Sequence, residues 1–77
     1  MRFELIMNMP TKKGDLIQRW VVEHPAPNLE DFIDELIEFN FVIVEEFFPD
    51  EITKAYKSHG LAAINGRYVA KIKKWER

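Results

Sequence analysis

The sequence predicts one α+β domain spanning residues 1–77, in which one amphipathic helix packs on one face of a mostly antiparallel sheet. Three observations support this fold class. Residues near the N-terminus alternate with a period of two, residues 29–37 have helical periodicity, and an Asn-Gly pair separates two strand-like runs near the C-terminus. The predicted order is β-β-α-β, a short helix or loop, and then β-β.

The first 23 residues predict a β-hairpin. Residues 2–9 alternate between two faces, as half-buried strands do: Phe3, Leu5, Met7 and Met9 on one, and Arg2, Glu4, Ile6 and Asn8 on the other. Residues 10–15 combine Pro, Gly and charge as loops do, and residues 16–23 are rich in Ile, Val and Trp, which favours a second strand. Pro25 and Pro27 end that strand, because proline donates no backbone hydrogen bond and disfavours helix in the residue before it.

The next segment predicts the helix. Asn28 suits its N-cap, acidic residues follow in the first turn, and Asn40 suits a left-handed C-terminal end. Five apolar residues recur at a spacing that keeps them on one helical face: Leu29, Phe32, Ile33, Leu36 and Ile37.

The remaining residues predict three strands. Residues 41–48 are β-branched and aromatic, and their continuous apolar run indicates a central strand. Residues 50–58 fit either a loop or a short helix, and we expect the helix. Residues 61–64 and 67–75 flank Asn65-Gly66, a pair that is typical of a type I′ turn, so the C-terminal segment is expected to be a hairpin.

A helix between the second and third strands predicts that these strands run parallel in the sheet. The first strand can then lie between them, antiparallel to both. This gives the strand order 2-1-3-4-5 with the helix on one face and the other face open.

Charge is strongly segregated along the chain. Residues 20–53 contain ten acidic residues and no Lys or Arg, whereas residues 54–77 contain seven basic residues and one acidic residue. The helix acids repeat at i, i+4, which destabilises an isolated helix by about 0.2–0.5 kcal/mol for each like-charge pair. They form a candidate partner-binding surface, the acidic face: Glu30, Asp31, Asp34, Glu35 and Glu38. The competing interpretation, which we favour, is a solvated face, which the basic C-terminal hairpin of the same chain or of a second copy could neutralise.

The last strand carries a basic stripe. Arg67, Val69, Lys71, Lys73, Trp75 and Arg77 share one parity. A surface formed by Arg67, Lys71, Lys73 and Trp75 predicts, as an alternative function, a binder of single-stranded nucleic acid, because cations follow phosphates and an aromatic ring stacks on bases. The competing interpretation, which we favour, is an edge strand that its lysines protect against aggregation.

The sequence shows no recognisable catalytic or cofactor motif. It contains no cysteine, and His24 and His59 are too far apart in sequence for a typical metal-ligand spacing, so we expect no metal site. Both histidines lie at the ends of predicted elements, where a loop or capping role is expected. Glu45 and Glu46 point to opposite faces of a regular strand, which argues against a paired acid and base.

These features predict a non-enzymatic binding or regulatory protein without a cofactor. Its protein contacts are expected on the acidic face and on the open sheet face, where the candidate aromatic residues are Trp20, Phe47, Phe48 and Trp75, although these four could instead fill the core. A homodimer is an alternative partner arrangement. The N-terminal residues lack a long apolar stretch and no segment is long enough to span a membrane, so we expect a cytoplasmic protein that does not contact membranes.

Overall fold

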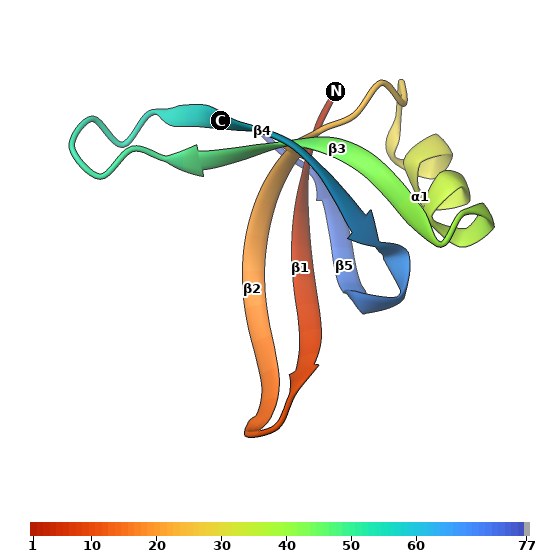
Figure 1. Ribbon diagram of the computed structural model, residues 1–77. Helices are drawn as coiled ribbons and strands as arrows, with labels where there is room; N and C mark the ends of the chain where they lie inside the picture. Colours follow the sequence, from red (N-terminus) through yellow and green to blue (C-terminus); the bar gives the residue numbers. More distant parts are fainter. Residues whose placement is uncertain (77) are drawn as a thin grey trace.

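A computed structural model describes residues 1–76 and contains one five-stranded sheet and one α-helix (Figure 1). The strand order is β4-β3-β2-β1-β5, and all neighbouring strands are antiparallel. The elements in chain order are β1 (Arg2–Thr11), β2 (Gly14–Glu23), α1 (Leu29–Glu38), β3 (Phe41–Pro49), β4 (Tyr56–Asn65), a 3₁₀ turn (Gly66–Tyr68) and β5 (Val69–Lys74). The predicted α+β class, with one helix on a mostly antiparallel sheet, is confirmed.

The predicted N-terminal hairpin is present and is longer than expected. β1 and β2 pair along their whole length, from Arg2 opposite Glu23 to Thr11 opposite Gly14. Gly14 has a φ of +117°, a conformation that L side chains rarely adopt, and so suits the tight turn at the tip. The tip projects away from α1 as a two-stranded arm (Figure 1).

The helix forms where its apolar periodicity places it. The Asn28 side chain accepts a hydrogen bond from the Asp31 N–H at 2.8 Å, which confirms the predicted N-cap. The C-terminal end differs from the prediction. Phe39 ends the helix with extended backbone at a φ of −110°, and Asn40 does not have a positive φ.

The core lies between α1 and the sheet face that the helix covers. Phe32 is fully buried and stacks on Phe3, with ring centroids 4.4 Å apart. The strands supply the other buried apolar residues of this face, and the main ones are Leu5, Met7, Val22, Val42, Val44 and Ile64. The odd-numbered face of the predicted first strand is therefore the core face.

The predicted strand order is wrong, and so is the parallel pairing of the second and third strands. β3 is antiparallel to β2 and pairs only at Val21–Glu23 with Glu45–Phe47. The parallel arrangement requires β3 to lie alongside β2, whereas only three residues of each strand pair. Instead β3 crosses the end of β2 (Figure 1).

The predicted C-terminal hairpin is also wrong. The Asn65 side chain accepts a hydrogen bond from the Arg67 N–H at 3.0 Å and begins a 3₁₀ turn, so no type I′ turn forms. The chain then crosses to the far edge of the sheet, where β5 pairs with β1. β4 and β5 are thus opposite edges of the sheet.

The expected short helix in residues 50–58 is absent, and a turn leads directly into β4. The Asp50 carboxylate accepts hydrogen bonds from the N–H groups of Ile52 and Thr53, at 2.8 and 3.0 Å. Lys54 takes a left-handed conformation, with a φ of +63°. These local hydrogen bonds satisfy the backbone without a helical turn.

The molecule is flat and open. Its principal extents are 36 × 35 × 19 Å. The radius of gyration is 12.7 Å, compared with roughly 11.5 Å for a compact domain of this length. In this shape, residues 1–76 leave the sheet face opposite α1 uncovered.

Candidate functional site

The acidic face lies on α1, away from the core. Glu30, Asp31, Asp34 and Glu38 are exposed, and Glu35 is half-buried. Within residues 1–76, no Lys or Arg forms an ion pair with any of these five carboxylates. Residues 1–76 therefore supply no direct ion pair to neutralise the acidic face, and its exposure agrees with a solvated surface.

His24 connects the acidic face to the core. Its side chain is buried, its Nδ1 accepts a hydrogen bond from the Ala26 N–H at 3.0 Å, and its Nε2 lies 2.7 Å from Glu35 Oε2. Because Nδ1 accepts a hydrogen bond, the neutral ring carries its proton on Nε2 and donates it to Glu35. The ring also packs against Phe32, with centroids 4.7 Å apart. His24 therefore has the expected loop role and fixes the position of Glu35, whereas His59, expected at an element end, lies within β4.

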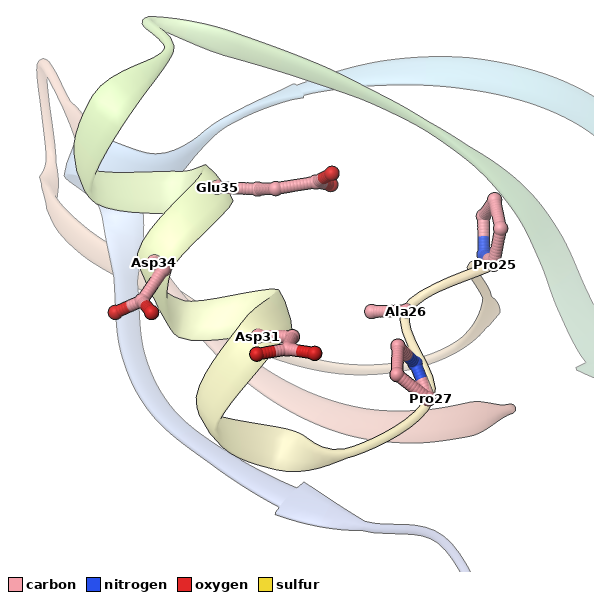
Figure 2. A pocket seen from close by; sticks show the side chains of 6 residues that line it. All are labelled: Pro25, Ala26, Pro27, Asp31, Asp34 and Glu35. Atoms are coloured by element: carbon pink, nitrogen blue, oxygen red, sulfur yellow. The ribbon is translucent and has the colours of Figure 1, made fainter.

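A hollow of about 360 Å³ separates α1 from the proline-rich loop before it (Figure 2). Its walls are Pro25, Ala26 and Pro27 on one side and Asp31, Asp34 and Glu35 on the other. Glu35 reaches from the helix across this space (Figure 2). The arrangement offers apolar ring surface next to carboxylates, which suits the stem and head of a Lys or Arg side chain.

The open sheet face has an apolar zone on β3 and β4. We use this name for Phe41, Ile43 and Leu61, which are 61%, 66% and 77% exposed. Their positions follow from the register. Ile43 lies opposite Ala63, and Leu61 lies opposite Glu45, one pair further along the same face. Large apolar side chains that gather on an uncovered face are typical of protein contact surfaces.

Sequence reasoning missed the apolar zone. The continuous apolar run in residues 41–48 is typical of a central strand that is buried on both faces. In the structure, residues 41–44 of β3 pair with β4 but not with β2, and α1 covers only the face that holds Val42 and Val44. The alternating exposure of β3 is set by this tertiary arrangement and leaves no signal in the local sequence.

A charged zone lies beside the apolar zone on the open face, and the exposed Ile17 lies on the same face further along β2, opposite Asn8. Glu4 is buried there, with Arg19 Nη2 at 3.0 Å and Lys73 Nζ at 3.9 Å from its carboxylate oxygens. The Arg2 guanidinium lies 4.1 Å from the Phe47 ring centroid, and it also pairs with Glu23. These groups satisfy one another, so the part of the open face around Glu4 and Arg2 is polar and lies next to the apolar residues of β3 and β4.

The basic stripe is only partly assembled. Lys71 and Lys73 lie on the open face of β5, opposite Ile6 and Glu4. A bulge next to Lys71 turns Val69 towards the core. Arg67 belongs to the 3₁₀ turn and lines a second hollow with Ile37 and Phe39, at the end of α1. Arg77 lies outside the described residues.

The four aromatic residues predicted for the open face are not its exposed residues. Phe47 is buried beneath Arg2, and Trp20 is half-buried against the core. Phe48 contacts His59, and Trp75 contacts Tyr56, in each case at ring-centroid distances of 4.9 Å. All four are partly or fully covered by their own chain.

The described residues carry no obvious reaction centre. Residues 1–76 contain no cluster of three or more His, Asp or Glu side chains placed to hold a metal ion. The ten-residue α1 is too short to cross a bilayer, and residues 1–76 contain no longer helix. Comparison of the chain with known protein families, curated proteins and solved structures yields no match.

Proposed function

We propose that this chain is a non-enzymatic protein-binding module that works through two opposite surfaces, the acidic face and the apolar zone. The observation that carries the proposal is the exposure of three large apolar side chains on the sheet face that α1 leaves uncovered. Fully burying side chains of this size stabilises a contact by about 1.5–3 kcal/mol each. A partner that covers the apolar zone gains this contribution.

The acidic face indicates the chemistry of a protein partner on the helix side. Four of its five carboxylates have no ion-pair partner within residues 1–76, and the fifth is fixed by His24. A basic partner gains charge complementarity there, which speeds association and selects against acidic proteins. The proposed partner on this side is a protein that presents Lys or Arg side chains to α1.

The test is affinity capture with matched variants of the tagged chain. Ile43→Asp places a charge in the apolar zone, and the triple variant Glu30→Lys, Asp34→Lys, Glu38→Lys reverses the acidic face; both alter exposed sites. Each variant is expected to lose partners that wild type retains, and Ile52→Asp, at a site 90% exposed in the turn before β4, should lose none. If both surface variants capture the same proteins as wild type, the proposal is wrong.

Binding of single-stranded nucleic acid is the second candidate function, supported by the exposed Lys71 and Lys73 on the open face of β5. Lys73 already lies near Glu4, and Trp75 packs against Tyr56. Both contacts reduce what these side chains offer to a ligand. Fluorescence anisotropy with labelled oligonucleotides at low salt tests this function, since phosphate contacts are salt-sensitive, and an unchanged signal would exclude it.

A further inference from the structure

The two edges of the sheet differ in how they are protected. β5 carries three exposed lysines, Lys71, Lys73 and Lys74, and we call it the lysine edge. At the other edge, Leu61–Asn65 of β4 contains no charged residue, and we call this segment the bare edge. Charged side chains on an edge strand prevent pairing with another chain, so the bare edge is open to pairing.

The bare edge adjoins the apolar zone. Leu61 belongs to both, and Ile43 lies across the β3–β4 ladder from Ala63. A register shift lies between β3 and β4 around His59 and Gly60, where Gly60 has a φ of +90°. The uninterrupted part of the edge therefore begins at Leu61, and Ala63 is its centre.

The exposed surface is larger than expected for a monomer. The chain exposes 5578 Å², whereas a compact monomer of 9.2 kDa exposes roughly 4,900 Å². The excess of roughly 650 Å² approaches the roughly 800 Å² that each partner contributes to a standard interface. The excess, summed over the molecule, is comparable with the area that one partner covers in such an interface.

From these observations we propose that the bare edge pairs with the bare edge of a second copy, antiparallel about a twofold axis at Ala63, to form one continuous ten-stranded sheet. This inference rests on the proposed protein-binding function and names the partner of the apolar zone. A twofold antiparallel pair is self-complementary, so one segment supplies both sides of the contact. Ala63 then lies opposite Ala63 of the second copy.

The apolar zones of the two copies become neighbours in this arrangement. Leu61 of each copy lies beside Asn65 of the other, on the same face as Ile43 and Phe41. The main-chain ladder and the apolar contacts hold the pair together, and the acidic face lies on the opposite side of the sheet. The dimer is therefore expected to be insensitive to salt.

The experiment measures mass by light scattering over a range of protein concentrations, at low and at high salt. We expect wild type to reach twice the 9.2 kDa of one chain at both salt concentrations. Ala63→Lys protects the bare edge and places two lysines opposite each other, and should weaken the dimer on the order of tenfold or more. Ala70→Lys, at an exposed alanine on the lysine edge, is the matched control and should leave the mass unchanged.

A second experiment, disulfide cross-linking, tests the inference even if Ala63→Lys does not fold well. The chain contains no cysteine, so a single Ala63→Cys introduces the only thiol. Directly opposite residues of antiparallel strands have Cα atoms about 4.5–5.5 Å apart, within the range that a disulfide spans. Mild oxidation should link Ala63→Cys into a covalent dimer much faster than Ala70→Cys.

Three results would overturn the inference. They are a wild-type monomer at every concentration, a dimer that salt dissociates and Ala63→Lys does not affect, and equal cross-linking at the two edges. None of these results contradicts the proposed function. That function is tested separately, by whether Ile43→Asp and the acidic-face variant lose captured partners. Failure of the function would instead appear as unchanged capture by those variants, whatever the oligomeric state.

Discussion

The backbone carbonyl of Leu36 lies where a side chain on Gly66 would begin. A β-carbon at Gly66 would be 2.8 Å from the Leu36 carbonyl oxygen, and this oxygen belongs to the last turn of α1. The 3₁₀ turn thus packs directly on the helix, and the absence of a side chain at position 66 permits the contact. This glycine is required by close approach, since its φ is not positive.

Gly66→Ala is expected to destabilise the protein by about 1–3 kcal/mol, as overpacking at a rigid backbone contact does. The measurement is the free energy of unfolding from urea titration. Ala70→Ser, at an exposed site in β5, is the control and should stay within about 0.5 kcal/mol of wild type. A Gly66→Ala variant as stable as wild type would show that the turn and the helix are not in close contact.

Two phenylalanines provide a second comparison at the residue scale. Phe32 is fully buried between His24 and Phe3, whereas Phe41 is 61% exposed. Phe32→Ala should destabilise the fold by about 3–5 kcal/mol because it removes buried surface and leaves a cavity. Phe41→Ala should change the unfolding free energy by much less. Similar losses for both variants would mean that Phe41 is not a surface residue in solution.

At the scale of elements, the sequence predicted what is locally encoded. The helix, its cap at Asn28 and the first three strands depend on periodicity and on neighbouring residues, and all are present. The turn at Asn65 was mispredicted because contact with α1 and pairing of β5 with β1 override the local preference of Asn-Gly. The apolar zone was missed for the same reason, since long-range pairing decides which face of β3 is covered.

The turn between β3 and β4 allows a prediction about pH. The N–H groups of Thr53 and Ile52, and then the Lys57 ammonium, hold the pKa of Asp50 below its usual value by binding the carboxylate. A lowered folded-state pKa means that the ionised side chain stabilises the fold above the unfolded-state pKa of about 3.9. This contribution is lost as the pH falls through the lower, folded-state pKa.

Asp50→Asn keeps an oxygen acceptor for the turn and removes the charge. The variant should be less stable than wild type at neutral pH, and the difference should disappear in acid below the folded-state pKa of Asp50. Urea denaturation midpoints at the two pH values measure this. Asp50→Ala, which also removes the acceptor, should be less stable than Asp50→Asn at both. A gap between wild type and Asp50→Asn that persists in acid would contradict the role of the charge.

At the scale of the whole molecule, the two halves of the sheet are hydrogen-bonded to each other over only a short stretch. β1 and β2 pair over ten residues each, but β2 and β3 pair only at Val21–Glu23 with Glu45–Phe47. The β1–β2–β5 part and the β3–β4 part are otherwise connected through the core and the chain turns. The lysines of β5 belong to the first of these parts, and α1, which carries the acidic face, contacts both β3 and β5.

Hydrogen exchange should resolve these two parts. Amides that pair β3 with β4 at residues 41–45 should exchange faster than amides in the middle of β1, which is paired on both sides by β2 and β5. Mass spectrometry of exchanged peptides measures the difference. If protection were equal across the sheet, the whole chain would open as one cooperative unit.

The lysines of β5 also decide how far the proposed assembly can grow. A chain with two bare edges would add further copies at either side and polymerise into a fibre, as unprotected sheets do. In the proposed ten-stranded sheet the two outer edges are the β5 strands, and Lys71, Lys73 and Lys74 protect these edges against the addition of further copies. In the proposed assembly, the positive charge of the C-terminal strand therefore limits the growth of the sheet.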